Sequence, residues 1–134
     1  MSAAGVIVIT HGNAAEDMVD AVERVVGKLG VRTISVRIGE PRHETETRLE
    51  KVVDELRADE VLFLTDLEGS TPYNLCCKRC GGKSVVLSGM NLPMLMKLAT
   101  ANRDHGAFAL AEELRATGLK SISIRTAMGN KGTP

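Results

Sequence analysis

Short apolar runs alternate along this chain with longer stretches in which apolar residues recur every three or four positions. The short runs predict five strands, at residues 5–10, 33–38, 61–65, 84–87 and 121–125. Nearly continuous apolar runs, such as 5–10 and 61–65, are typical of strands covered on both faces. The run at 121–125 instead alternates polar and apolar residues, which predicts an edge or antiparallel strand.

Helical spacing fills the segments between these runs. Met18, Val22, Val25 and Leu29 are spaced as on one face of a helix, and Gly30 is expected to end that helix. Further helices are expected around residues 49–56, from Pro72 to 81–82, from the N-cap Asn91 to Ala99, and around 110–114.

Strands and helices that alternate at this spacing indicate an α/β fold. We expect one domain, residues 1–134, with an open, doubly wound, mostly parallel sheet and helices on both faces. The C-terminal edge strand is expected to be antiparallel, and residues 129–134 to form a disordered tail.

Two candidate chemical groups directly follow predicted strands. His11 comes one position after the first strand and Asp66 one position after the third. Open α/β sheets bind ligands beyond the carboxyl ends of their strands, where the strand order reverses, so neighbouring first and third strands would bring the two side chains together. A neutral imidazole, with a pKa of about 6.5, is a good nucleophile. A carboxylate beside it would select the tautomer and stabilise the charge that develops as the ring takes a phosphoryl group. The alternative is a turn histidine that bonds loop carbonyls.

A glycine and two hydroxyl residues, Gly69, Ser70 and Thr71, lie between Asp66 and a helix that Pro72 is expected to start. Outward-pointing N–H groups and a helix dipole are typical of an anion-binding loop. The alternative is that Ser70 and Thr71 serve as ordinary helix caps.

Composition excludes several classes of function. The 134 residues carry 17 basic and 17 acidic side chains, for a net charge of zero, and only 2% are aromatic. A polyanion-binding surface or a base-stacking nucleic-acid platform is therefore not expected. No apolar run approaches the ~20 residues needed to cross a membrane, and no basic leader or cleavage site precedes the first strand, so we expect a cytoplasmic protein.

Three cysteines, Cys76, Cys77 and Cys80, lie within five residues. An odd, clustered count does not indicate a secreted disulfide framework. A zinc site would need a fourth ligand such as His43 or His105, neither at a recognisable spacing. A redox pair is a further alternative, and apolar packing is the interpretation that we favour.

Three segments together resemble the mannose-type enzyme IIA family of the bacterial sugar phosphotransferase system. They are the Thr10-His11-Gly12 strand end with its preceding apolar run, residues 61–74 from the third strand through the loop to Asn74, and residues 88–95, which read Ser-Gly-Met-Asn-Leu-Pro-Met-Leu. The likeness covers nearly the whole chain in order and spacing.

The resemblance implies a phosphoryl carrier. His11 would accept phosphate from the histidine phosphocarrier HPr and pass it to a IIB partner. Asp66 would hydrogen-bond to His11, and the turn of Gly69, Ser70 and Thr71 would hold the phosphoryl oxygens. The family usually forms homodimers, often by exchanging a C-terminal strand, and the resemblance implies no metal and no organic cofactor.

One departure from the family pattern affects the loop. The family usually has Gly-Gly-Ser-Pro where this chain has Gly69-Ser70-Thr71-Pro72. If the position of Ser70 requires a positive φ, the loop is strained or reshaped. This departure motivates an alternative function, a regulatory protein-binding module of the same fold with little or no phosphoryl transfer. Sugar uptake and pure regulation both stay open, as does a thiol-based sensor.

Overall fold

A computed structural model describes residues 3–79, 83–127 and 129–130. Its centre is a sheet of four parallel strands in the order β2-β1-β3-β4. The strands are β1 (Gly5–His11), β2 (Arg32–Val36), β3 (Val61–Thr65) and β4 (Val85–Leu87). The α/β fold with a parallel sheet is thus confirmed, and β1 lies between β2 and β3.

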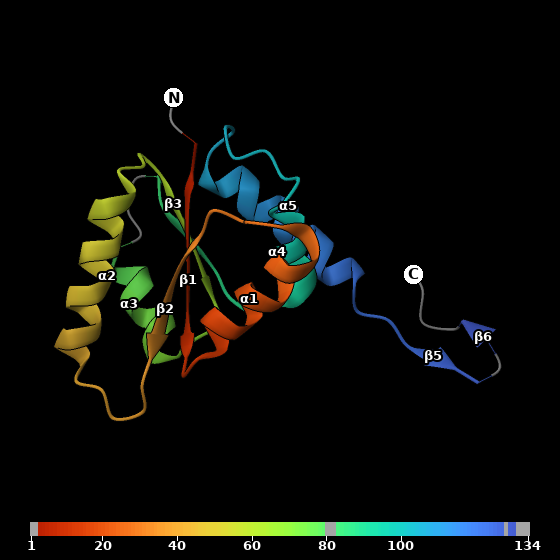
Figure 1. The fold of residues 1–134 in the computed structure, drawn as a ribbon, viewed down its shortest axis with the longest axis horizontal. Coiled ribbons are helices and arrows are strands. Elements are labelled where there is room, and N and C mark those ends of the chain that lie inside the picture. Colours follow the sequence, from red (N-terminus) through yellow and green to blue (C-terminus); the bar gives the residue numbers. More distant parts are fainter. Residues whose placement is uncertain (1–2, 80–82, 128, 131–134) are drawn as a thin grey trace.

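Helices cover both faces of this sheet (Figure 1). One face packs against α1 (Ala14–Val26), α4 (Leu92–Lys97) and α5 (Ala107–Lys120). The other packs against α2 (Arg42–Leu56) and α3 (Thr71–Arg79). In Figure 1 β1 runs from the N-terminus at the top to its arrowhead at the bottom, so the carboxyl ends of the parallel strands lie at the bottom of the view.

The central strand shows why the apolar runs are continuous. Val6 and Val8 of β1 belong to the core on the α1 side, whereas Ile7 and Ile9 belong to the core on the α2 side. All four side chains are fully buried. Because successive side chains of a strand point to opposite faces, a strand covered on both faces needs apolar residues at every position.

The first helix ends earlier than predicted. It stops at Val26, and Gly27 follows with a φ of 90°, outside the helical region. Val25, expected on the buried face, is 73% exposed, because Ala15, Val19 and Val22 face the sheet instead. Leu29 is still buried, but it packs from the loop that follows the helix rather than from the helix itself.

The C-terminal segment also differs from the prediction. The expected strand at 121–125 overlaps β5 (Arg125–Thr126) only at its last residue, and β5 pairs antiparallel with β6 (Gly129–Asn130) in a separate two-stranded sheet. The first two residues of the tail expected to be disordered are therefore paired, and residues 131–134 lie outside the described residues. The hairpin stands apart from the body of the molecule (Figure 1). An alternating pattern is compatible with a strand but does not specify its partner.

Candidate functional site

The structure brings His11 and Asp66 together. They are 55 residues apart in the sequence, yet His11 Nδ1 lies 2.8 Å from Asp66 Oδ2. The strands that carry them are parallel neighbours, with Ile9 opposite Thr65, so their carboxyl ends meet at the same edge of the sheet.

One carboxylate oxygen holds the histidine at two points. Asp66 Oδ2 also accepts the backbone N–H of His11 at 3.1 Å, while Oδ1 accepts the N–H of Leu67 at 2.9 Å. An ionised carboxylate only accepts hydrogen bonds, so Nδ1 carries the ring proton and the lone pair lies on Nε2. The ring is thereby fixed in orientation and in tautomer.

Asp66 stays ionised in this setting. Burial by itself would raise the pKa of its carboxyl group, but the hydrogen bonds from the His11 ring, the His11 N–H and the Leu67 N–H outweigh burial and hold the pKa below its ordinary value. The side chain of Asp66 is 24% exposed and that of His11 is 47% exposed. The carboxylate is therefore partly shielded while the ring remains open to an approaching molecule.

The turn beneath His11 is fixed by its neighbours. The Thr10 hydroxyl is buried and accepts the N–H of Ala15 at 2.6 Å, which joins β1 to the start of α1. The N–H of Gly12 donates to Val36 O at 2.8 Å, which joins the same turn to β2. Thr10 was not among the residues expected at the site. The sequence signal for it is a polar residue at the end of an otherwise apolar strand.

The loop after Asp66 is not strained by its departure from the family pattern. Positive φ occurs at Gly69, at 80°, and among the described non-glycine residues only at Arg57, so Ser70 has an ordinary backbone conformation. The Ser70 hydroxyl donates a hydrogen bond to Leu67 O at 2.7 Å. Its oxygen also accepts a hydrogen bond from the backbone N–H of Tyr73, in the first turn of α3, with 3.4 Å between Oγ and N. Ser70 therefore caps the helix, and Thr71 is the first helical residue.

The cysteines are not gathered into a metal site by the part of the chain that is described. Cys76 is fully buried in the core and Cys77 is exposed, while Cys80 lies outside the described residues. His43, at the start of α2, and His105, in the loop before α5, are both exposed. Across residues 3–79, 83–127 and 129–130, no group of three or more His, Cys, Asp and Glu side chains could hold a metal ion.

None of the helices in the described ranges is both long enough and apolar enough to cross a membrane.

Fold and site together define a class of doubly wound α/β proteins that present a carboxylate-oriented histidine where the strand order reverses. Comparison with known families is more specific. Residues 5–115 match the family model EIIA-man, described as the PTS system fructose IIA component, and the chain belongs to this family of the phosphotransferase system (PTS).

Individual relatives agree with this assignment. The chain is 31% identical over 131 residues to the PTS system mannose-specific EIIAB component of Escherichia coli (strain K12), covering 90% of this chain but only 40% of that protein. It is 28% identical over 112 residues to the sorbose-specific EIIA component of Klebsiella pneumoniae, covering 82% and 83% of the two chains.

Solved structures show the same fold. The mannose/sorbose specific IIA subunit from Enterococcus faecalis superposes with a TM-score of 0.85 at 24% identity, over 93% of this chain and 96% of that one. The PTS IIA protein associated with the fucose utilization operon of Streptococcus pneumoniae has a TM-score of 0.76 at 30% identity, over 91% and 94% of the two chains.

Proposed function

We propose that this chain is a phosphoryl carrier in which His11 Nε2 accepts a phosphoryl group from phosphorylated HPr and passes it to a IIB component. The observation that carries the proposal is the double hydrogen bond from His11 to one oxygen of Asp66, which leaves Nε2 as the ring nitrogen with a lone pair. We further propose that it acts in the cytoplasm, without a metal or an organic cofactor.

The transfer exchanges one N–P bond for another. The lone pair of His11 Nε2 forms the new bond to phosphorus, and the electron pair of the old N–P bond returns to the ring nitrogen of the donor. A donor ring that is protonated on its other nitrogen leaves as a neutral imidazole. The proton on His11 Nδ1 stays in place, so the phosphorylated ring carries a positive charge, which the Asp66 carboxylate stabilises.

The phosphoryl oxygens are negative and need hydrogen-bond donors that offset the nearby Asp66 charge. We assign this role to the loop of Gly69, Ser70 and Thr71 at the N-terminus of α3, where the helix dipole favours an anion. The Ser70 hydroxyl already donates to Leu67 O, so Ser70 would act by shaping the turn. The N–H groups of Gly69 and Thr71 and the Thr71 hydroxyl would make the contacts.

The test is phosphorylation in a reconstituted chain of donors. The protein is incubated with phosphoenolpyruvate, enzyme I and HPr, and its intact mass is measured. We expect one added phosphoryl group that is lost in acid and kept in base. His11→Ala should abolish the adduct, while His105→Ala, which removes another exposed histidine, should keep it. Label that persists in His11→Ala would move the site elsewhere.

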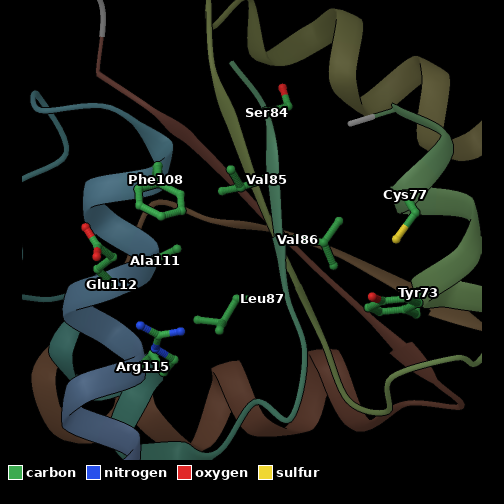
Figure 2. A pocket seen from close by; sticks show the side chains of 10 residues that line it. All are labelled: Tyr73, Cys77, Ser84, Val85, Val86, Leu87, Phe108, Ala111, Glu112 and Arg115. Carbon is green, nitrogen blue, oxygen red and sulfur yellow. The ribbon is translucent and has the colours of Figure 1, made fainter. Parts of the chain in front are cut away.

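We also propose that the carrier is a homodimer in which each chain's C-terminal segment reaches its partner. The outer edge of β4 supports this, because within the described residues β4 pairs only with β3. A groove of about 410 Å³ lies over that edge. Figure 2 shows Val85 and Leu87 of β4 facing Phe108 and Arg115 of α5, while Val86 faces α3.

The C-terminal segment has the properties of an occupant for this groove. Ile122 and Ile124 are 67% and 70% exposed, and the segment leads into the hairpin that stands away from the body (Figure 1). Apolar residues on an extended segment and an unpaired strand edge are both aggregation liabilities when left open, and an exchange between two copies would cover both.

The alternative of a regulatory module with little transfer rested on Ser70, and the ordinary backbone of Ser70 removes that motivation. Whether transfer serves sugar uptake or regulation depends on the partners, and neighbouring genes for membrane IIC and IID subunits would favour uptake. A thiol sensor is disfavoured at Cys76, which is fully buried. It would have to use Cys77, which is exposed, or Cys80, which lies outside the described residues.

A further inference from the structure

Two large aliphatic side chains are exposed on the edge of the sheet that carries His11. Ile38 is 101% exposed and Leu67 is 62% exposed. Leu67 directly follows Asp66, and Ile38 lies two residues beyond the end of β2. Because β2 and β3 flank β1, the chain places these two residues on opposite sides of the strand that ends at His11.

Chain geometry keeps both of them close to the site. Val36, the last residue of β2, pairs with His11 across the sheet. Consecutive Cα atoms are about 3.8 Å apart, so the Cα of Ile38 lies within about 7.6 Å of that of Val36, and the Cα of Leu67 lies about 3.8 Å from that of Asp66. A protein that docks over His11 Nε2 would contact both residues.

A largely buried carboxylate, that of Glu40, joins the loop that carries Ile38 to α2 by hydrogen bonds. The side chain of Glu40 is only 8% exposed. It accepts the Thr45 hydroxyl at 2.5 Å and Arg48 Nη2 at 2.6 and 2.8 Å, and it also accepts the Arg37 N–H at 3.3 Å. The hydrogen bonds from Thr45 and Arg48 outweigh burial and lower the pKa of Glu40 to about 2. The loop is therefore clamped at neutral pH.

Single exposed aliphatic residues are common and by themselves indicate nothing. These two residues differ from such cases in position, since they flank the histidine proposed to receive phosphate. Ile38 also lies in a loop that the hydrogen bonds of Glu40 already order. A preordered loop loses little conformational entropy when a partner binds.

We infer that Ile38 and Leu67 are the apolar anchors that dock the protein exchanging a phosphoryl group with His11, and that Glu40 positions Ile38. The inference rests on the proposed function. The partner is a protein, because a small phosphoryl donor that reached Nε2 would touch neither anchor. Its surface is apolar on both sides of its phosphoryl-bearing residue, because the two anchors are aliphatic. Full burial of one aliphatic side chain corresponds to about ten- to a hundredfold in affinity.

The experiment separates docking from chemistry by using two donors. Ile38→Ser and Leu67→Ser are compared with Val25→Ser, which removes another exposed aliphatic side chain, 73% exposed, from the last turn of α1. Single-turnover transfer is measured at increasing concentrations of phosphorylated HPr, and separately with phosphoramidate as a small donor.

For Ile38→Ser and Leu67→Ser we expect the half-saturating concentration of phosphorylated HPr to rise about tenfold, with an unchanged maximal rate. The rate with phosphoramidate should stay at the wild-type value, and Val25→Ser should match the wild type throughout. Half-saturation within twofold of Val25→Ser would overturn the inference and leave the proposed function intact. If transfer from phosphoramidate slows as much as transfer from phosphorylated HPr, the substitution has disturbed His11 itself, and the inference would also be overturned.

The positioning role of Glu40 is tested by asking whether the effect of its substitution depends on Ile38. Glu40→Gln should raise the half-saturating concentration in the wild-type background, because it frees the loop, but should add little in the Ile38→Ser background. Additive effects would show that Glu40 does not act through Ile38 and would overturn its positioning role. If wild-type His11 accepts phosphate from neither donor, the proposed function fails and this inference falls with it.

Discussion

Replacing Asp66 by asparagine tests how the carboxylate controls the His11 ring. The substitution keeps the shape of the side chain but turns one of its two acceptor oxygens into an NH₂ donor. In the native protein both oxygens accept hydrogen bonds, Oδ2 from His11 and Oδ1 from the Leu67 N–H. An asparagine therefore cannot satisfy both sides at once.

Both orientations of the new amide are unfavourable, for different reasons. With its oxygen toward Leu67, the NH₂ group faces His11, and Nδ1 must then accept a hydrogen bond. The ring proton moves to Nε2, and the nucleophilic lone pair is lost. With its oxygen toward His11, the tautomer is kept but the NH₂ group opposes the Leu67 N–H, and the negative charge that stabilises the phosphorylated ring is gone.

We expect Asp66→Asn to fold normally and to transfer phosphate more slowly by a factor on the order of 10² to 10³, comparable to the loss of one preorganised electrostatic partner. The matching change beside a serine-protease histidine costs about 10⁴. We expect a smaller loss here, because that histidine relays a proton, whereas His11 is itself the nucleophile.

The assay is single-turnover transfer from phosphorylated HPr, with circular dichroism to confirm the fold. Glu68→Gln is the matched control, since it neutralises an exposed carboxylate two residues further along the same loop. If Asp66→Asn folds and transfers within a few-fold of the wild type, Asp66 is not the orienting carboxylate. A large loss in Glu68→Gln would then identify Glu68 in its place.

Two other predictions address assembly and stability. The full chain should have twice the mass of one copy by light scattering at micromolar concentration, and a chain ending at Lys120 should be monomeric; a monomeric full chain would refute the dimer. The pKa of Glu40 is lowered on folding from 4.5 to about 2, so the stability that it contributes should be complete above about pH 4.5 and lost as the pH falls toward 2. The difference in denaturation midpoint between wild type and Glu40→Gln should therefore shrink over that range, and a difference independent of pH would contradict the ionised clamp.

Much of the secondary structure was predictable from local patterns. The run at 61–65 became β3 with the same bounds, because five consecutive buried positions leave little ambiguity. Asn91 caps α4 as expected, with its Oδ1 accepting the Met94 N–H at 3.1 Å, since capping depends on residues only a few positions apart. The end of α1 was misplaced, because several apolar spacings fit this segment and only packing decided which face is buried.

The candidate site, too, was predictable only in part from the sequence. The sequence alone located His11 and Asp66 at strand ends, and the assumption that the first and third strands are neighbours was needed to predict that they would meet. The tertiary structure decided three further details: which ring nitrogen faces Asp66, that Ser70 caps a helix without strain, and that Glu40, two residues after Ile38, accepts hydrogen bonds from Thr45 and Arg48. These depend on hydrogen bonds and backbone angles that no periodicity encodes.

The C-terminal segment shows most clearly what the sequence determines and what it leaves to the tertiary structure. Alternation of polar and apolar residues at 121–125 indicates an extended segment with one apolar side, and that much follows from the two-residue period of a strand. The partner strand is a different matter, because strand pairing joins residues that are distant in the chain or in another copy. Among the residues that the structure describes, β5 pairs with β6, and β4 pairs only with β3, which leaves its outer edge facing the groove. Which edges are filled is decided by the packing of whole elements, and a local pattern contains no information about it.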